Sequence, residues 1–448
     1  MTRFKKIDVT KSVCPICLKE VSASVISKNQ KVFIFKKCSR HGKFLFPHIW
    51  DNIKLYRYMK KLRSEIHYNR PNVGIITDVT SQCNLKCSFC FGVNSYRKKG
   101  ADLSQSEIAR INKIIKEQNF KSPSIYLFGG EPTLRKDIFG LIRKLKKLGL
   151  EACLFTNGIK LSDLRYVHLL KKAGTDHIIL QFDGCNDEIY KRIRGMKLLS
   201  KKMAAMDNLK KNRIVTSLFV PLIKNVNEEE VGNILSLPLK YENIKNIFFS
   251  TITFEGKCPD NMKQISNYER FALVEKATGA SEEDFFISTL FDHKISKFIE
   301  TLTKKPVKHI SPTCDLVCYF YSSSFKPVPL TRIIDLSYAI RWLDKCMKFR
   351  TKRYSKISKE AIKLFFDSGK VCKYRGYFFY LILNSFFLMF SSLFRQHIEN
   401  SFNKIFRVFI TQFQDRYNLD QKSFKGCNIY SVCDDKLRPF CEKIILKV

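Results

Sequence analysis

Apolar runs of strand length alternate with stretches of helical periodicity between about residue 72 and residue 252. A run that is hydrophobic throughout is typical of a parallel strand that is buried on both faces. The pattern predicts strands at 73–79, 124–128, 151–156, 177–182, 214–223 and 244–252. It predicts helices at 104–118, 137–148, 162–173, 186–211 and 227–238. Six such units in succession predict an α/β fold whose parallel sheet closes, or partly closes, into a (β/α)6 barrel.

Short polar motifs follow each of the first four predicted strands. Three cysteines lie in 83–90 after the first strand, and Gly-Gly-Glu-Pro-Thr occupies 129–133 after the second. Thr-Asn-Gly at 156–158 follows the third strand, and Asp-Gly at 183–184 follows the fourth. In a barrel of this kind the loops after the strands share one face, and that face holds the active site. We therefore expect these four motifs to meet in one pocket.

The chain divides into three predicted regions. Residues 1–70 form a small module, 71–290 the barrel, and 291–448 a helical, aromatic and cysteine-bearing region. The stretch 376–394 has no charged residue and is long enough to span a membrane. We interpret it instead as a buried or membrane-facing helical hairpin, because a span would separate the last cysteines from the barrel. A further helix with an aromatic stripe is predicted at 397–417.

The formal charge of +39 suits a polyanionic partner, either nucleic acid or an anionic membrane surface. A solvated basic surface from a lysine-biased genome explains the charge equally well. The chain also has 16 cysteines, and its first residues carry no apolar segment of a secretory signal. We therefore expect a cytoplasmic protein in which cysteines bind metal rather than form disulfides.

Four residues of the N-terminal module have the spacing of a metal knuckle. Cys14 and Cys17 form a Cys-x2-Cys pair, and about twenty residues later Cys38 and His41 form a Cys-x2-His pair. Three thiolates and an imidazole suit tetrahedral zinc or a mononuclear iron. The module is thus predicted to resemble a rubredoxin or a zinc ribbon, with Fe and Zn both open.

The cysteines of 83–90 follow a Cys-x3-Cys-x2-Cys spacing, which supplies three thiolates from one loop. A [4Fe–4S] cluster normally takes one cysteine for each of its four irons, so three thiolates leave one iron free to bind a substrate or cofactor. A structural zinc with a distant fourth ligand is the alternative. The neighbouring motif favours a cofactor site, because Gly129 and Gly130 allow close backbone approach and Glu131 can accept from an ammonium group.

The cysteine triplet and the Gly-Gly-Glu-Pro motif together resemble the radical S-adenosylmethionine (SAM) superfamily. The resemblance implies that the free iron binds the amino and carboxylate groups of SAM. An electron from an external donor then cleaves SAM to a 5′-deoxyadenosyl radical, which abstracts hydrogen from an unactivated carbon. The implied catalytic cluster ligands are Cys83, Cys87 and Cys90. The implied SAM-binding residues are Gly129, Gly130, Glu131, Asn157, Asp183 and Arg194.

The order of motifs along nearly the whole chain resembles the archaeal-type tetraether lipid synthase group. These motifs include "CPIC", "CNLKCSFC", "GGEPTLRKDI", "TNGIKL", "LQFDGCNDEIYKRIRG" and the cysteine-rich segment 413–441. The resemblance implies the joining of two saturated isoprenoid tails by a carbon–carbon bond, with two SAM molecules used. It also implies auxiliary [4Fe–4S] clusters, one of which could hold the first alkyl radical on sulfur. The implied auxiliary ligands are Cys314, Cys318, Cys427 and Cys441, with Cys346, Cys372 and Cys433 in reserve. The group tends to have a cysteine where this chain has His309, which bears on the number of clusters.

An anionic lipid is consistent with the composition, because a basic surface suits headgroups and the uncharged stretch 376–394 suits tails. We therefore expect a lipid or membrane surface as the partner, a location at the membrane periphery, and no nucleic acid, since no RNA-binding module is visible.

Three alternatives remain open at this point. One is a radical SAM methyltransferase that acts on a pterin-like small molecule, which would need no membrane-like helix. Another is a radical SAM enzyme that modifies peptide or RNA. The third is a non-enzymatic zinc-ribbon protein that binds nucleic acid, which leaves the cysteine triplet unexplained.

Overall fold

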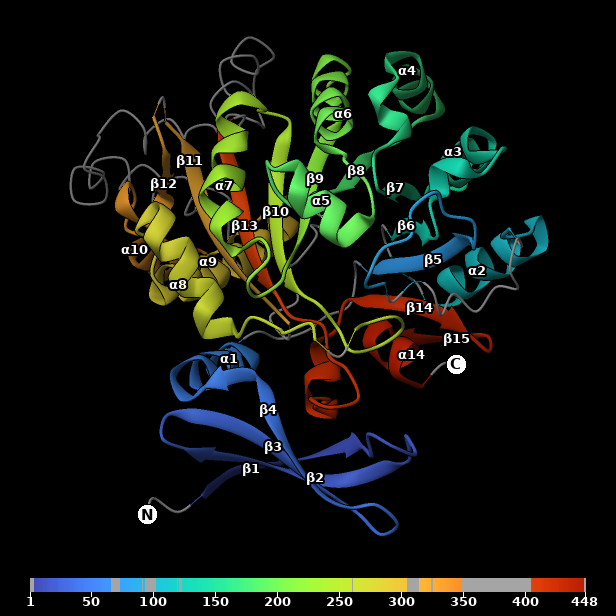
Figure 1. Cartoon of the computed structure of the whole chain (residues 1–448). Helices are drawn as coiled ribbons and strands as arrows, with labels where there is room; N and C mark the ends of the chain where they lie inside the picture. The colour runs from blue at the N-terminus through green and yellow to red at the C-terminus, as the bar shows by residue number, and fades with distance from the viewer. Residues whose placement is uncertain are drawn as a thin grey trace.

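The structure, a computed structural model, contains two β-sheets. It describes residues 4–65, 73–90, 92, 102–118, 120, 123–259, 261–303, 314–323, 325–348 and 404–446. The smaller sheet has the strand order β1-β2-β3-β4, and the larger has the order β12-β11-β13-β10-β9-β8-β7-β6-β5-β14-β15. In Figure 1 the small blue sheet lies below the large one, and α1 lies between them.

The small sheet is an antiparallel meander. Its strands are β1 (Lys5–Val13), β2 (Glu20–Lys28), β3 (Lys31–Cys38) and β4 (Gly42–Asn52), and α1 (Ile53–Glu65) follows. Because β1 and β3 run in the same direction, their carboxyl ends lie at one end of the sheet. The two predicted metal-binding pairs follow these two strands, so the meander brings them together.

Six parallel strands form the centre of the large sheet, in chain order, and confirm the predicted α/β barrel fold. They are β5 (Gly74–Thr80), β6 (Ser124–Gly129), β7 (Glu151–Thr156), β8 (His177–Gln181), β9 (Val215–Leu222) and β10 (Ile244–Thr251). Their connecting helices are α2 (Gln105–Glu117), α3 (Ile138–Lys147), α4 (Leu164–Ala173), α5 (Asp187–Arg194), α6 (Leu199–Lys211) and α7 (Val231–Lys240). The helix predicted at 186–211 is thus two helices, because Gly195 ends α5 in a left-handed conformation with φ of 81°.

The helix predicted at 397–417 is wrong, because its described part contains β13 (Ile405–Thr411), which pairs in parallel with β10. Phe406 and Val408 face the helices of the main hydrophobic core, whereas Phe409 stacks on Phe248 inside the barrel at 4.4 Å. The aromatic residues of this segment therefore alternate between two faces, as in a strand, although their spacing is also compatible with a helix.

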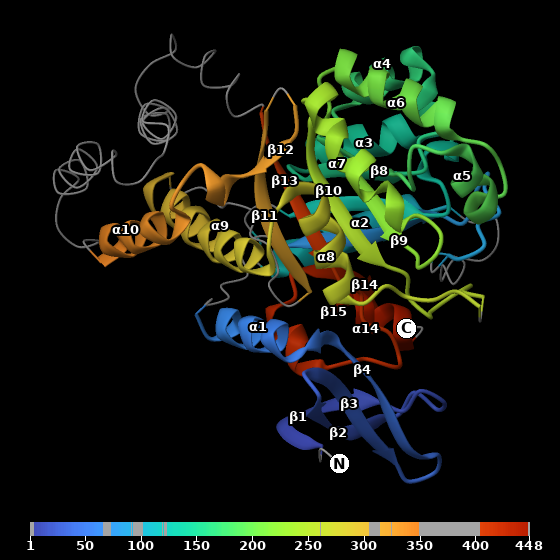
Figure 2. The same ribbon diagram turned by 60° about the vertical axis from the view of Figure 1, so that its left-hand side comes forward.

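The C-terminal region also differs from the expected helical one, since it contributes four more strands to the large sheet. These are β11 (Asp315–Ser322), β12 (Pro327–Pro329), β14 (Ile429–Cys433) and β15 (Lys436–Pro439), and β14 pairs with β5. The helices of this half are α8 (Asn267–Thr278), α9 (Glu282–Thr303), α10 (Leu336–Lys348) and α14 (Phe440–Leu446). Figure 2 shows α9 and α10 beside β11 and β12, at the edge of the sheet away from β5.

Short 3-10 turns complete the described elements. They are η2 (Pro132–Leu134), η3 (Lys160–Ser162), η4 (Glu228–Glu230), η5 (Leu330–Arg332) and η7 (Gln421–Gly426). The uncharged stretch 376–394 lies outside the described residues. Among the residues that are described, no helix is both long and apolar enough to cross a membrane.

The N-terminal module is bound to a segment near the end of the chain. Thr10 Oγ1 donates to Asp420 Oδ1 at 2.6 Å, and Ser12 Oγ donates to the Leu419 carbonyl at 2.6 Å. The fully buried Lys36 donates to the Arg416 carbonyl at 2.7 Å. Burial lowers the pKa of Lys36 to about 8. These contacts join residues that are about 400 positions apart in sequence.

Candidate active site

The cysteine triplet lies on the loop that follows β5, and this loop is bound to two other parts of the barrel. The Ser88 amide donates to the Ile193 carbonyl at 2.9 Å. Cys90 and Lys257 exchange two backbone hydrogen bonds of 2.7 and 2.9 Å. The loop is therefore fixed between the end of α5 and the segment after β10, so its conformation is set by the fold.

The two glycines after β6 are required by a close approach of the chain to itself. A Cβ atom on Gly129 would lie 2.4 Å from the Thr80 carbonyl oxygen, and one on Gly130 would lie 2.1 Å from that of Gln82. In turn, the Gly130 amide donates to the Thr80 carbonyl and the Glu131 amide to the Gln82 carbonyl. The sequence suggested that these glycines let the backbone approach a ligand. The structure shows that they hold the cysteine loop against the end of β6.

Glu131 lies at the junction of β6 and β7 and is 1% exposed. Its carboxylate accepts from Thr133 Oγ1 at 2.5 Å, Thr156 Oγ1 at 2.6 Å and the Asn157 amide at 2.7 Å. Asn157 Nδ2 in turn donates to Asn84 Oδ1 at 2.8 Å, which links the third motif to the cysteine loop. The motifs expected at one face therefore meet there, while direct SAM contacts of these residues stay a prediction.

Asp183 and Arg194 form a buried, two-pronged ion pair. Arg194 Nε and Nη2 donate to the two carboxylate oxygens of Asp183 at 2.8 and 2.6 Å. The guanidinium also interacts with Cys87 and lies 4.8 Å from the ring centre of Phe89. The resemblance implied that Asp183 and Arg194 both bind SAM, which stays a prediction. The carboxylate that Arg194 meets in the structure is that of Asp183, so the pair places a fixed positive charge beside one cysteine of the triplet.

Lys202 of α6 is a buried residue of this region that no sequence motif indicates. Its Nζ donates to the Asn157 carbonyl at 2.6 Å and to Gln181 Oε1 at 2.8 Å. Burial lowers the pKa of Lys202 to about 7. It is a lysine on a lysine-rich helix, and only the tertiary structure distinguishes it from its exposed neighbours.

A pocket of about 130 Å³ is lined by all three cysteines of the triplet together with the Gly-Gly-Glu motif. Its other wall is aromatic, and Phe128, Phe155 and Phe219 of this wall belong to a closed ring of five phenylalanines. Neighbouring ring centres are 5.2 to 6.2 Å apart, in the order Phe128, Phe155, Phe219, Phe413, Phe440 and back to Phe128. Each such pair contributes about 0.5–1.5 kcal/mol beyond burial. The pocket therefore combines a thiol-rich side with an apolar side.

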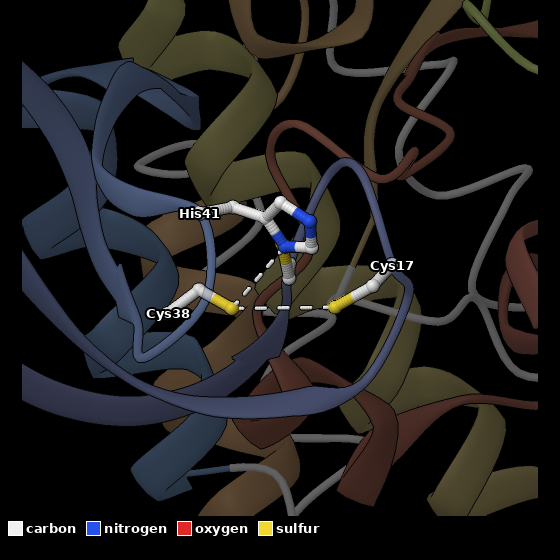
Figure 3. A group of neighbouring side chains, drawn as sticks. Cys17, Cys38 and His41 are labelled. Carbon is white, nitrogen blue, oxygen red and sulfur yellow. Dashed lines mark hydrogen bonds between the residues drawn. The ribbon is translucent and has the colours of Figure 1, made fainter.

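The N-terminal knuckle forms a compact metal centre. The ligand atoms of Cys14, Cys17, Cys38 and His41 all lie within 4.8 Å of one another. Cys38 Sγ is 3.6 Å from His41 Nδ1 and 4.0 Å from Cys17 Sγ, as Figure 3 shows. Hydrogen bonds from the backbone of Arg40 and the side chain of His41 lower the pKa of Cys38 to about 6, which favours the thiolate that a metal binds. This geometry fits one tetrahedral ion.

The four cysteines expected to bind auxiliary clusters are not all brought together. Cys441 of α14 is partly buried and lies near Cys427. Desolvation first, and then the Cys427 thiol, raise its pKa to about 12. Cys314 lies at the same end of the barrel, where its Sγ is 3.9 Å from Asp315 Oδ2. Cys318 instead packs in the apolar core against α9, with its Sγ 3.8 Å from Ser288 Oγ. Its pKa is raised by burial.

The reserve cysteines are placed only in part. Cys433 is buried at the end of β14, where burial raises the pKa of its thiol. The side chains of Cys346, Cys372 and His309 lie outside the described residues.

Comparisons with known proteins match two regions of the chain to family profiles. The radical SAM superfamily profile matches residues 77–237, and the profile of the HMPTM N-terminal zinc ribbon domain matches residues 6–46. A relative from Methanocaldococcus jannaschii, named 7,8-dihydro-6-hydroxymethylpterin dimethyltransferase, is 30% identical over 96% of this chain and 92% of its own length. A probable GTP 3′,8-cyclase from Thermococcus kodakarensis is 24% identical over 50% of this chain and 69% of its own.

Similar solved structures include SuiB from Streptococcus suis bound to S-adenosylmethionine. It is 18% identical, and the match covers half of each chain with a TM-score of 0.39.

Proposed function

Because this chain belongs to the radical SAM superfamily, we propose that its site abstracts hydrogen from the saturated tails of an anionic isoprenoid lipid and joins two tails by a carbon–carbon bond. Three thiols on one short loop fit a [4Fe–4S] cluster with one free iron, so Cys83, Cys87 and Cys90 would hold it. When bound, the cluster supplies the electron that cleaves SAM into methionine and a 5′-deoxyadenosyl radical.

The residues of the chain contribute orientation, charge and exclusion of water. Arg194, fixed by Asp183, keeps a positive charge beside Cys87. Glu131 joins the ends of β6 and β7 through buried hydrogen bonds, so the loops that face the pocket keep one arrangement. The phenylalanine ring makes the opposite wall apolar and keeps water from it, which strengthens the electrostatic interactions inside the pocket.

The observation that carries the lipid proposal is this ring. Phe128, Phe155 and Phe219 line the same pocket as the cysteines, so a reacting carbon would lie between the cluster side and a wall of hydrocarbon. A saturated tail would bury apolar surface against this wall, whereas the polar groups of a ring system would find partners only on the other side of the pocket, at Thr156, Asn157, Gln181 and Arg194.

The coupling reaction balances with two SAM molecules for each bond. Two 5′-deoxyadenosyl radicals each remove one hydrogen atom, and the two carbon radicals combine. The products are one carbon–carbon bond, two 5′-deoxyadenosines and two methionines, and an external donor supplies two electrons.

The test is lipid mass spectrometry of a host that makes the chain. Each joined pair of tails should carry two hydrogens fewer than the two separate tails, and Cys87→Ala should abolish the product. Formation of 5′-deoxyadenosine by the active protein with an unchanged lipid profile would refute the proposal.

A second candidate is the methylation of a pterin, which is favoured by the name of the Methanocaldococcus jannaschii relative and by its match over most of the chain. The purified holoenzyme would then methylate 7,8-dihydro-6-hydroxymethylpterin at the expense of SAM. A methylated pterin together with unchanged lipids would decide for this candidate.

Partners and auxiliary clusters follow from the lipid proposal. The charge of +39 supports association with anionic membrane surfaces, which cosedimentation with anionic and neutral vesicles tests directly. The proximity of Cys427 and Cys441 supports a shared auxiliary cluster there. The zinc-ribbon match supports zinc rather than iron in the N-terminal centre.

A further inference from the structure

A second cavity, of about 470 Å³, lies between the N-terminal module and the carboxyl ends of β10 and β13. It is large enough for a small organic molecule. Its walls come from three segments: the second half of β4, the chain from the end of β10 to the start of α8, and the chain after β13. The first two segments were not selected by the sequence motifs, and the third is the beginning of the cysteine-rich segment 413–441. The proposed lipid chemistry does not use this cavity.

One wall has polar groups that lack partners. Thr251 is only 4% exposed, and its hydroxyl oxygen has no hydrogen-bond partner among the described residues. Asp51 Oδ1 is also buried and unpartnered within the same part of the chain. Both residues line the cavity. Buried polar atoms are nearly always paired with protein or with ordered water, so two such atoms on one cavity offer acceptors to a ligand that carries hydrogen-bond donors.

The third polar residue, Asp415, is fully buried and leaves one oxygen weakly engaged. Its Oδ1 accepts from the amides of Tyr417 and Asn418 at 3.0 and 3.2 Å. Its Oδ2 has only long contacts, 3.4 Å from the Phe254 amide and 3.5 Å from Gln264 Nε2. Oδ2 is therefore the less satisfied of the two oxygens, in a side chain that is fully buried in the cavity wall.

The opposite wall is aromatic. The ring of Tyr417 makes edge contacts with Phe46 at 5.1 Å and with Phe254 at 5.7 Å, and all three line the cavity. Such faces and edges bind planar apolar groups, and their faces attract cations.

The local charge is opposite to that of the whole chain. Asp51, Asp415 and Glu269 line the cavity, whereas lysine and arginine are absent from the described residues that do so. Arg270 lies behind the wall, where it is bound to Asn267 Oδ1, Gln412 Oε1 and two carbonyls. Lys224 is outside the cavity and is paired with Glu269. Surface charges are screened beyond about 8–10 Å. The buried Arg270 and His48 act on Asp51 and partly offset its charge, so the carboxylates would hold a ligand mainly through hydrogen bonds.

We propose that this cavity binds a small aromatic amine or amidine, whose N–H groups bind Asp51 and Thr251 and whose ring packs on Tyr417. The ligand is distinct from SAM and from the substrate of the radical reaction.

The probe is benzamidine, which combines a planar ring with a charged amidinium, and the control is benzoate, which has a similar shape and the opposite charge. Isothermal titration of the full chain, with its metals loaded, should show one benzamidine per chain and at least about 10-fold weaker binding of benzoate. Asp51→Asn should weaken benzamidine binding by about 10-fold, the loss expected for one charge-assisted hydrogen bond. Glu20→Gln, the same chemical change at an exposed residue of β2, should leave binding unchanged.

Thr251→Val is a second test that does not depend on a charged residue. Valine has nearly the shape of threonine, and it removes a hydroxyl that is unpaired in the free protein, so this variant should keep its fold. It should weaken benzamidine by about 3-fold. Equal binding of benzamidine and benzoate, no binding of either, or unchanged binding by both cavity variants would overturn the proposal.

Discussion

The ion pair between Asp183 and Arg194 should be the most sensitive electrostatic contact of the candidate active site. Replacing Asp183 by asparagine keeps the side-chain shape but removes the charge opposite a guanidinium whose side chain is only 6% exposed. Breaking one partner of a buried pair leaves an uncompensated charge, which costs about 3–5 kcal/mol of folding free energy. We therefore expect Asp183→Asn to lower the unfolding free energy by that amount in urea titrations of the metal-loaded chain.

The chain contains a matched control for this experiment. Arg135 donates to both carboxylate oxygens of Asp137 at 2.6 and 2.9 Å, so the two pairs have the same chemistry and a similar geometry. The two arginines are similarly buried, at 4% and 6% exposed, but Asp137 is 51% exposed whereas Asp183 is 0% exposed, so water can replace the Asp137 carboxylate. Asp137→Asn should therefore cost about 1 kcal/mol or less. Equal losses for the two variants, or a loss below 1 kcal/mol for Asp183→Asn, would refute the argument that burial makes this pair expensive to break.

Three further predictions concern buried and metal-binding groups. Burial lowers the pKa of Lys202 from 10.5 to about 7. Between these pH values the unfolded chain binds a proton that the folded chain lacks. The free energy of unfolding should therefore rise with pH across this window. Lys202→Met should remove this rise, which urea titrations of both proteins at pH 7 and pH 9 measure. The same pH dependence of stability in the variant would show that Lys202 is not its cause. Cys38→Ser should weaken zinc binding by more than about 100-fold in a chelator competition while the iron content stays the same. Anaerobically reconstituted protein should bind more than four irons per chain. Cys427→Ala and Cys441→Ala should each lower the number of bound irons, and Cys318→Ala should leave it unchanged. A total of four or fewer irons in the unchanged chain would exclude auxiliary clusters.

The sequence predicted those parts of the fold that repeat locally. Six apolar runs identified the six central strands, and the spacing of Cys14, Cys17, Cys38 and His41 identified the N-terminal metal centre that the meander assembles. Both predictions depend on short-range periodicity and on the rule that loops after parallel strands share a face.

The parts that could not be predicted depend on contacts between distant segments. The stripe of β13 fitted a helix as well as a strand until its pairing with β10 was known. The phenylalanine ring unites residues between 128 and 440, and no local pattern indicates that they meet. Lys202 differs from neighbouring lysines only because the ends of β7 and β8 enclose it. Cys318 shares its residue type with the metal-binding cysteines but faces the core, since it lies on the opposite side of β11 from Asp315.

The place of the last forty residues in the fold has a consequence for how the protein is made. On the ribosome, β5 and β10 emerge long before β14 and β13, which pair with them, and the N-terminal module emerges before the segment on which it docks. For most of synthesis the nascent chain therefore exposes two unpaired strand edges and one uncovered metal module, which are states prone to aggregation. The sheet cannot be completed until β13 and β14 have been made, so a host with limited chaperone capacity should yield more soluble protein when translation is slowed and cooled.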